Sequence, residues 1–159
     1  MNIRIGNGYD VHAFTDGSFI TLGGVKIPHT SAFKAHSDGD VLMHAICDAL
    51  LGALALGDIG KHFPDNLDKY KDIDSRILLR NVYRLIINEG FVLQNLDSVI
   101  MAESPKLAPH INNMRARIAE DLNVEIDRVS VKATTTEGLG FVGEKEGLAA
   151  SATVLLLKS

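Results

Sequence analysis

Asp10 and His12 stand two residues apart within residues 3–14, a segment whose pattern predicts a β-strand. Because side chains at positions i and i+2 of a strand point to the same face, one carboxylate and one imidazole would project together. His44 lies early in an apparent helix and would close the set. Two histidines and one aspartate with a fourth position open are typical of a catalytic zinc site rather than a sealed structural one. Asp-x-His is also common by chance, so an ordinary buried histidine paired with an aspartate remains an alternative.

The size and charge of the chain limit its function. Its 159 residues fit one domain, and a hydrophobic fraction of 46% is enough for a real core. The net charge of −4 argues against a general nucleic-acid binder, which is usually basic. A phosphorylated small molecule remains compatible with this charge, because lysines, backbone N–H groups and metal ions bind phosphate locally. We therefore expect a small-molecule partner and no nucleic acid.

Cysteine usage and the N-terminus indicate a compartment. Cys47 is the single cysteine, so no intramolecular disulfide forms, and its apolar helical neighbours favour a small core residue. No stretch approaches the ~20 apolar residues of a membrane span. The N-terminus has neither the basic and apolar regions of a signal peptide nor a transit peptide ahead of Asp10. We expect a cytoplasmic protein that does not contact a membrane.

Strand and helix patterns are mixed along residues 1–159, which we expect to form a single domain. The predicted strands are residues 3–14, where Gly6 and Gly8 allow close backbone approach, a hairpin over 19–27 bent at Gly23-Gly24, and residues 96–102, 129–133 and 148–157. The predicted helices are residues 38–56, a second from Asp74-Ser75 to Gly90, and a third that begins at Pro109. The last strand is nearly continuous in apolar or small residues, so we expect both its faces to be buried. The mixture predicts an α+β fold, a two-layer domain with a mixed β-sheet and helices on one face.

Two polar segments have the composition of ligand-binding loops. Residues 63–71 are long enough for a mobile functional loop, although a solvated connection fits equally well. Three threonines at 134–136 precede Glu137, and their hydroxyl and N–H groups suit phosphate oxygens while the glutamate suits Mg²⁺. A turn capped by threonine, with Glu137 as the reciprocal cap, explains the same residues. Lys106 is either a phosphate contact or a surface lysine.

Four segments, in a fixed order, carry these residues. They are Gly8-Tyr9-Asp10-Val11-His12, then Ala35-His36-Ser37-Asp38-Gly39-Asp40-Val41 with His44, then Gly57-Asp58-Ile59-Gly60-Lys61-His62-Phe63-Pro64-Asp65, and Lys132-Ala133-Thr134-Thr135-Thr136-Glu137. Together they resemble the 2-C-methyl-D-erythritol 2,4-cyclodiphosphate synthases of the non-mevalonate isoprenoid pathway, over essentially the whole chain. The joint occurrence of the four segments is specific, although each alone is not.

The resemblance implies a phosphorus–oxygen lyase that is a homotrimer with active sites at subunit interfaces. Its substrate, 4-diphosphocytidyl-2-C-methyl-D-erythritol 2-phosphate, would be converted to 2-C-methyl-D-erythritol 2,4-cyclodiphosphate with release of CMP. Zn²⁺, or Mn²⁺ or Co²⁺ in its place, would bind to Asp10, His12 and His44. Mg²⁺ or Mn²⁺ would bind to Glu137 with the substrate diphosphate. His36 and Thr135 would stabilise the transition state.

The resemblance also implies two groups of substrate contacts. The contacts at the metal and the methylerythritol part would be Asp10, His12, His36, Ser37, Asp58, Ile59, Gly60, Phe63, Pro64, Asp65, Asn66 and Leu67. The contacts at the cytidine and diphosphate end, largely from the neighbouring subunit, would be Ala102, Glu103, Ser104, Pro105, Lys106, Leu107, Ala108, Thr134, Thr135, Thr136, Glu137 and Phe141.

The chemistry of the implied reaction agrees with these residue types. The nucleophile is the substrate's own 2-phosphate, which is already an anion, so no strong general base is needed. The difficulty lies in bringing two anionic phosphates together, which requires positioning and neutralisation of charge. Zn²⁺ at the β-phosphate and Mg²⁺ between the α- and β-phosphates would supply that neutralisation.

One segment departs from the family pattern. Many members carry an arginine where this chain has Glu144, and that arginine lines a cavity on the threefold axis where isoprenoid diphosphates bind. Three copies of Glu144 would repel an anion there. We expect axial binding of isoprenoid diphosphates to be weak or absent unless Lys145 turns inward.

Two other functions use the same residues. A metal-dependent phosphatase or phosphodiesterase would hydrolyse the substrate to an open product instead of a cyclic one. A trimeric metal- or nucleotide-binding module would have no need of the loop at 63–67 or of the threonine and glutamate set at 134–137. The presence of both segments favours the cyclase.

Overall fold

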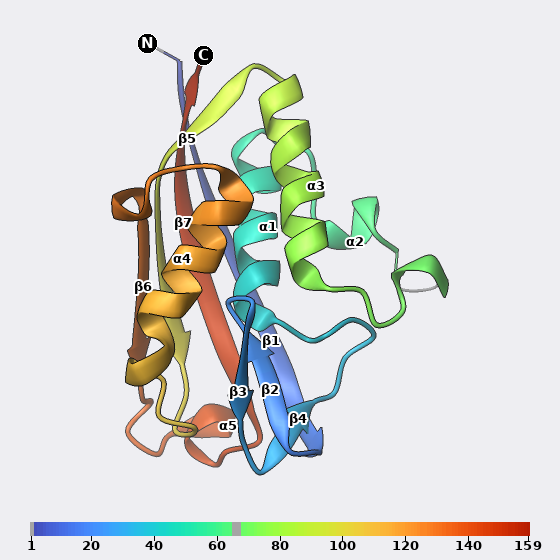
Figure 1. The fold of residues 1–159 in the computed structure, drawn as a ribbon, viewed down its shortest axis with the longest axis vertical. Coiled ribbons are helices and arrows are strands. Elements are labelled where there is room, and N and C mark those ends of the chain that lie inside the picture. The colour runs from blue at the N-terminus through green and yellow to red at the C-terminus, as the bar shows by residue number, and fades with distance from the viewer. Residues whose placement is uncertain (1, 65–67) are drawn as a thin grey trace.

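A computed structural model describes residues 2–64 and 68–159 of the chain (Figure 1). The strands are β1 (Ile3–Asp16), β2 (Phe19–Leu22), β3 (Val25–Pro28), β4 (Ser31–Phe33), β5 (Phe91–Met101), β6 (Val129–Thr134) and β7 (Gly147–Lys158). The α-helices are α1 (Val41–Ala53), α2 (Ile59–His62), α3 (Ser75–Asn88), α4 (Ile111–Leu122) and α5 (Gly140–Gly143). Three short 3₁₀ helices are η1 (Asp68–Tyr70), η2 (Ala108–His110) and η3 (Ile126–Arg128).

The main sheet is mixed, as the sequence predicts. Its strand order is β4-β1-β7-β5-β6, and only the β5–β6 pair is parallel among the strands that the structure describes. The parallel pair brings the carboxyl ends of β5 and β6 to the same edge of the sheet. A separate hairpin, β2–β3, turns at Gly23 and Gly24, which both have positive φ angles. The predicted α+β fold with a mixed sheet is therefore confirmed.

The long helices form a layer on one face of the sheet (Figure 1). Helix α1 packs on β1 and β7, α4 packs on β6, and α3 packs on both of these helices. Gly6 and Gly8 make the α1 contact possible, as expected. A Cβ atom at Gly8 would lie 1.9 Å from the carbonyl oxygen of Ala45, and one at Gly6 would lie 1.8 Å from that of Ala49. Only a strand without side chains at these two positions lets the helix backbone come this close.

No described residue of this chain covers the opposite face of the sheet. Ile5 and Tyr9 of β1 point to that face and are 69% and 55% exposed, and Ile3 and Val11 beside them are also exposed. These four residues are called the outer β1 face below. The core lies between the sheet and the helices, and includes nearly all of α1.

Several element boundaries differ from those predicted. The first helix begins at Val41, because Asp40 caps it, and ends at Ala53 rather than at residue 56. Strand β5 begins at Phe91, five residues before the predicted start. Residues 68–70 form a 3₁₀ turn within the loop that was expected to be irregular.

The prediction for the last strand was only partly right. The first four residues of β7 are buried, but Thr153 is exposed and Leu155 and Leu157 are half-buried. Burial alternates along this part of β7 because no segment within residues 2–64 and 68–159 covers the outer side of the sheet.

Candidate functional site

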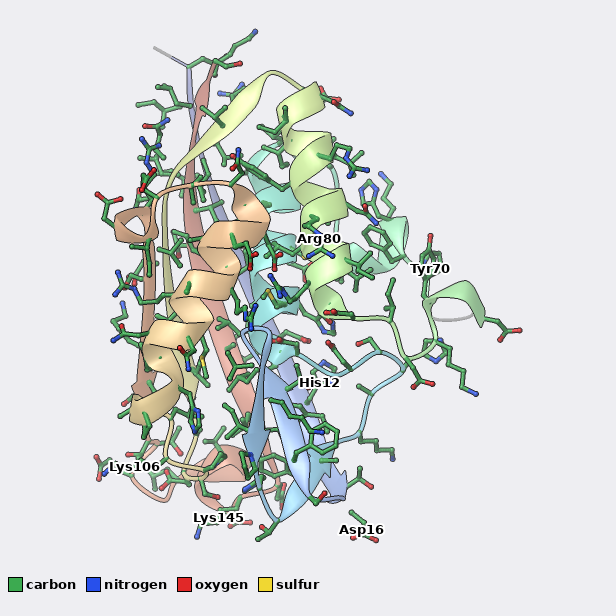
Figure 2. The ribbon with its side chains drawn as sticks, in the orientation of Figure 1. His12, Asp16, Tyr70, Arg80, Lys106 and Lys145 are labelled. Atoms are coloured by element: carbon green, nitrogen blue, oxygen red, sulfur yellow. The ribbon has the colours of Figure 1, made fainter. Side chains whose placement is uncertain are left out.

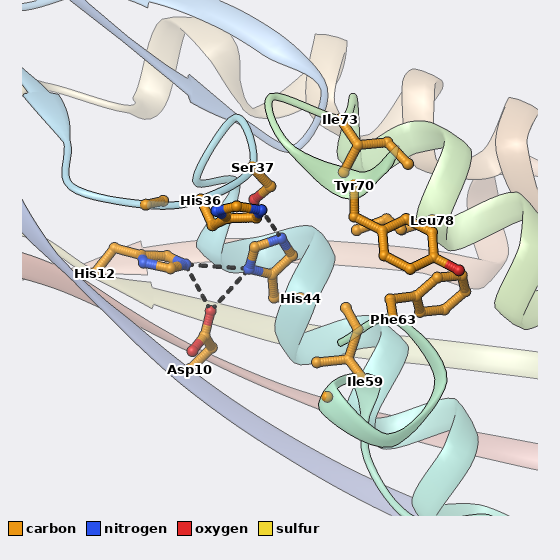
Figure 3. Close-up of a pocket in the computed structure, with 12 residues that line it drawn as sticks. Asp10, His12, His36, Ser37, His44, Ile59, Phe63, Tyr70, Ile73 and Leu78 are labelled. Carbon is orange, nitrogen blue, oxygen red and sulfur yellow. Dashed lines mark hydrogen bonds and ion pairs between the residues drawn. The ribbon is translucent and has the colours of Figure 1, made fainter. Parts of the chain in front are cut away.

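Three predicted metal ligands converge at the junction of β1 and α1 (Figure 3). Asp10 Oδ2 lies 3.0 Å from His12 Nε2 and 3.1 Å from His44 Nδ1, and the two nitrogens are 3.1 Å apart. Strand β1 directs Asp10 and His12 to one face, and α1 brings His44 to them in its first turns. The structure therefore brings together the set that the Asp-x-His spacing predicts.

The three ligand atoms suit a cation better than a hydrogen-bond network. A carboxylate oxygen can only accept hydrogen bonds. If one imidazole nitrogen accepts a hydrogen bond from the other, it carries no proton and cannot donate one to Asp10. At most two of the three contacts can therefore be hydrogen bonds. A tetrahedral zinc ion with bonds of ~2.0–2.1 Å places its ligand atoms ~3.3 Å apart, close to the observed separations. The donor set fits a divalent metal.

Charge at this cluster follows the same arrangement. Burial opposes ionisation of Asp10, but its contacts with His12 and His44 outweigh burial and hold the pKa of the carboxyl well below its usual range. Burial lowers the pKa of His44, whereas the hydrogen bond and charge of Asp10 raise it. The net result is a raised pKa for His44. Asp10 is therefore ionised and ready to bind a cation.

A second set of side chains fixes the far side of His44. Ser75, at the start of α3, is fully buried, and its Oγ lies 2.9 Å from His44 Nε2. The Ser75 hydroxyl donates to Asp38 Oδ1 at 2.5 Å, and the Ser75 backbone N–H donates to Asp38 Oδ2 at 3.0 Å. Ser37 Oγ lies farther from the same histidine nitrogen, at 3.3 Å. The sequence predicted Asp74-Ser75 as the cap of this helix, and Asp74 is the N-cap. The contact of Ser75 with His44 was not predicted.

A pocket of about 230 Å³ opens beside the three ligands. Figure 3 shows the polar cluster on one side and an apolar wall on the other. Its lining residues are Asp10, His12, Ala35, His36, Ser37, His44, Ile59, Gly60, Phe63, Tyr70, Ile73 and Leu78. A charged end and an apolar wall suit a small ligand that carries both phosphate and carbon groups.

Helix α2 supplies part of the apolar wall and is held by α1. Asp48 of α1 accepts a hydrogen bond from the backbone N–H of Ile59 at 2.7 Å. Asp58 caps α2 by accepting from Lys61 N at 2.9 Å. Asp58 was predicted as a substrate contact but does not line the pocket in this chain. Its carboxylate caps the helix that carries Ile59 and Gly60, and its contact with substrate remains a prediction.

The threonine and glutamate segment lies at the carboxyl ends of β5 and β6. Glu103 Oε1 accepts hydrogen bonds from Thr136 N at 2.9 Å and from Gly138 N at 3.3 Å. The Thr136 hydrogen bond is the main reason that the pKa of Glu103 is lowered. Glu137 has a φ of 55°, a left-handed conformation that is uncommon outside glycine. Glu103, predicted as a ligand contact, thus shapes the loop that carries Glu137.

This second group does not line the pocket of the same chain. Figure 2 shows Lys106 at the lower end of the molecule and His12 near its centre. The predicted contacts in this second group are Ala102, Glu103, Ser104, Pro105, Lys106, Leu107, Ala108, Thr134, Thr135, Thr136, Glu137 and Phe141. One chain therefore carries two separate halves of the predicted site.

Some pocket residues were missed by sequence reasoning. Tyr70 lies within the predicted loop at 63–71, Ile73 lies just beyond it, and Leu78 falls within the predicted second helix. Apolar residues that line a ligand pocket look like core residues in a sequence, because both follow helical spacing. Pro64, a predicted substrate contact, does not line the pocket. The predicted contacts Asp65, Asn66 and Leu67 lie outside the residues that the structure describes.

Fold and site together define a class: single-domain α+β proteins with an open two-histidine, one-aspartate cluster beside a pocket. The model of the YgbB family matches residues 3–157. The 2-C-methyl-D-erythritol 2,4-cyclodiphosphate synthase of Ectopseudomonas mendocina (strain ymp) is 62% identical over 157 residues, which are 99% of this chain and 100% of that protein. The synthase of the same name from Thioalkalivibrio sulfidiphilus (strain HL-EbGR7) is 61% identical over 155 residues, 98% of this chain and 97% of that protein.

Solved structures agree with the sequence relatives. The bifunctional IspDF from Campylobacter jejuni superposes with a TM-score of 0.96 at 47% identity, covering 99% of this chain and 43% of that chain. The CDP complex of IspF from Plasmodium falciparum gives a TM-score of 0.87 at 38% identity, covering 99% of this chain and 97% of that one.

This chain belongs to the YgbB family, the 2-C-methyl-D-erythritol 2,4-cyclodiphosphate synthases. The family cyclises the cytidine-diphosphate derivative of methylerythritol phosphate to the cyclodiphosphate, in isoprenoid biosynthesis. The resemblance of the four sequence segments is therefore confirmed. No helix within residues 2–64 and 68–159 is long and apolar enough to cross a membrane.

Proposed function

We propose that this chain converts 4-diphosphocytidyl-2-C-methyl-D-erythritol 2-phosphate to 2-C-methyl-D-erythritol 2,4-cyclodiphosphate and CMP at the pocket next to Asp10, His12 and His44. The observation that carries the proposal is the convergence of these three ligand atoms at one end of a pocket whose other wall is apolar. An anionic phosphate suits the metal end. The methylerythritol carbons suit the wall that includes Ile59 and Phe63.

The residues of the pocket position the reacting groups rather than take a proton. The 2-phosphate is an anion and needs no base to attack the β-phosphate, so the new P–O bond forms as the bond to CMP breaks. A divalent metal bound at the cluster supplies fixed positive charge for the phosphates. His36 and Ser37 line the same pocket and would hold the phosphate oxygens by hydrogen bonds. Zn²⁺ fits the two-histidine, one-aspartate set, and Mn²⁺ or Co²⁺ would bind with the same ligands.

The cytidine end would be bound by the second half of the predicted site. Lys106, Thr134 and Thr135 offer a cation and hydroxyl groups for the diphosphate, with Thr135 as a stabiliser of the transition state. Glu137 would bind Mg²⁺ or Mn²⁺ between the phosphates through a carboxylate oxygen. The CDP in the complex of the Plasmodium falciparum relative supports a cytidine ligand for this chain.

We further propose a homotrimer in which each active site combines the two halves from neighbouring copies. Two observations support this assembly. The half with Lys106 and Glu137 is not part of the pocket of its own chain, and the outer β1 face leaves large apolar side chains exposed. Residues 1–159 would form one synthase domain per subunit. The cytoplasmic location expected from the sequence remains a prediction.

The decisive experiment follows the reaction by ³¹P NMR with the purified protein, substrate and Mg²⁺. Formation of CMP and a coupled pair of cyclic diphosphate signals, both lost in a His44→Ala variant, would support the cyclase and its metal site. CMP together with open phosphates only would favour the hydrolase, and no turnover by a metal-loaded trimer would favour a binding module.

Glu144 remains a predicted difference at the axis of the trimer. It is the C-cap of α5, next to Lys145, whose φ is 62°. Titration calorimetry with geranyl or farnesyl diphosphate should detect weak binding or none. Tight binding at one molecule per trimer would contradict this expectation.

A further inference from the structure

Ser75 and Asp38 form a chain of polar contacts on the far side of His44. Asp38 accepts three hydrogen bonds: Oδ1 from Asp40 N at 3.1 Å and from the Ser75 hydroxyl at 2.5 Å, and Oδ2 from Ser75 N at 3.0 Å. A carboxylate accepts but does not donate, and an O–H···O⁻ contact of ~2.5–2.7 Å is typical of a charge-assisted bond. The single Ser75 hydroxyl proton therefore points to Asp38.

The direction of that proton has a consequence for His44. With its proton given to Asp38, Ser75 Oγ presents a lone pair to His44 Nε2, which lies 2.9 Å away. The contact is a hydrogen bond only if Nε2 carries the proton, and the tautomer with Nε2–H leaves a lone pair on Nδ1. His44 Nδ1 is the atom that faces Asp10 and His12.

We infer that Asp38 and Ser75 are positioning residues that keep His44 in the Nε2–H tautomer, so that its Nδ1 binds a metal ion rather than a proton. Without them, His44 Nδ1–H could donate to Asp10, which lies 3.1 Å away, and close the cluster on itself. Hydrogen bonds that a metal-binding histidine makes through its other nitrogen orient the ring in this way. The inference deepens the proposed metal centre and rests on it.

Ser37 provides a matched control, because its hydroxyl approaches the same nitrogen. Its Oγ lies 3.3 Å from His44 Nε2 and accepts a hydrogen bond from Gly39 N at 3.2 Å. Ser37 has no contact with the Asp38 carboxylate among the hydrogen bonds of the described residues. It therefore cannot set the direction of the proton as Ser75 does.

The test uses the full-length protein and Zn²⁺ as the probe. Zn²⁺ affinity is measured by competition with a chromophoric chelator, and the tautomer of His44 is measured in the metal-free protein by NMR with ¹⁵N-labelled histidine. Wild-type protein should show Nε2–H. Ser75→Ala and Asp38→Asn should each shift His44 toward Nδ1–H and weaken Zn²⁺ binding about 10- to 100-fold. Ser37→Ala should bind Zn²⁺ within about threefold of wild type.

A double variant tests whether the two residues act as one chain of hydrogen bonds. Ser75→Ala combined with Asp38→Asn should bind Zn²⁺ about as weakly as Ser75→Ala alone, because coupled residues are not additive. Circular dichroism melts check that each variant folds. Additive losses, or an equal loss in Ser37→Ala, would overturn the inference, and so would an unchanged tautomer in Ser75→Ala. Absence of Zn²⁺ binding by wild-type protein would instead overturn the proposed metal centre itself.

Discussion

At the scale of single residues, three acidic side chains near the predicted site act as acceptors for the backbone. Asp48, Asp58 and Glu103 each accept a hydrogen bond from a backbone N–H group that belongs to a segment of the predicted site. From sequence, Asp58 and Glu103 were expected to touch the ligand directly. In the structure each also holds a backbone segment of the predicted site, and their contact with the ligand remains a prediction.

Replacement of Glu103 by glutamine tests this role. Glutamine keeps the shape but weakens the acceptor for Thr136 N and Gly138 N, so the loop with Thr135 and Glu137 should lose its fixed geometry. We expect a several-fold rise in KM for the cytidine substrate and little change in Tm. Steady-state kinetics would measure the first and differential scanning calorimetry the second. An unchanged KM would mean that Glu103 does not order this loop.

The acidity of Glu103 adds a dependence on pH. The pKa of Glu103 is lowered from its ordinary value of 4.5, so the carboxylate form is favoured in the folded protein. Its hydrogen bonds therefore stabilise the loop fully at pH values above 4.5. This stabilisation is lost as the pH falls through the lowered pKa. CDP binding by wild-type protein should therefore weaken between pH 6 and pH 3.5. The variant Glu103→Gln cannot be protonated in this range and should not show that weakening.

At the scale of elements, one buried carboxylate joins two of them. Asp40 caps α1 through Met43 N at 3.1 Å and also accepts from Gly23 N at 2.9 Å and Gly24 N at 2.7 Å at the turn of the β2–β3 hairpin. Asp40, His44 and Asp48 lie four residues apart and connect α1 to three different partners: the hairpin, the Asp10–His12–His44 cluster and α2.

Burial of Asp40 should make stability depend on pH. Burial, and then the charge of Asp38, raise the pKa of Asp40 from 3.8 to about 6. Because the folded state holds this proton more tightly than the unfolded state, the free energy of unfolding should fall as pH rises from about 4 to about 6. The fall, relative to Asp40→Asn, should be on the order of 1 to 3 kcal/mol. Urea unfolding of both proteins at pH 4, 5, 6 and 7 measures it, and parallel curves would contradict the prediction.

The contact between β1 and α1 depends on a glycine. In Gly8→Ala the new Cβ would meet the backbone of Ala45, which cannot move without displacing the helix, so we expect a loss of about 3 kcal/mol or more. Gly52→Ala is the control, since its Cβ would lie 3.8 Å from the nearest atom and alanine favours the helix by up to about 1 kcal/mol. Chemical unfolding measures both. Similar stability of the two variants would contradict the packing described.

At the scale of the whole molecule, the proposed assembly is tested at the outer β1 face, where large apolar side chains are exposed. Ile5→Asp places a charge on that face and should dissociate the proposed trimer, with loss of turnover. Zn²⁺ binding should persist, because Asp10, His12 and His44 belong to one chain.

Analytical ultracentrifugation measures the assembly. Ile87→Asp is the matched control, because Ile87 is 44% exposed but lies in the helix layer on α3. It should remain a trimer and active. The proposed assembly would be contradicted if Ile5→Asp remained a trimer. It would also be contradicted if either variant were active as a monomer.

The sequence determined the local parts of this protein. Strand alternation directs Asp10 and His12 to one side, helical spacing places His44, and Gly6 and Gly8 allow the helix to approach, all within short stretches of chain. The fold class and the candidate status of Asp10, His12 and His44 follow from these patterns, while their assignment as metal ligands came from the resemblance of the four segments.

Only the tertiary structure decided how distant segments meet. The contact of Ser75 with His44 joins α3 to α1, and the Asp48 and Asp40 hydrogen bonds join α1 to α2 and the hairpin. The spacing of residues along the sequence does not predict such contacts. Each contact depends on how whole helices and strands pack against one another. The separation of the two halves of the predicted site also depends on packing. The parallel pairing of β5 and β6 places the half with Lys106 and Glu137 at the carboxyl ends of these two strands.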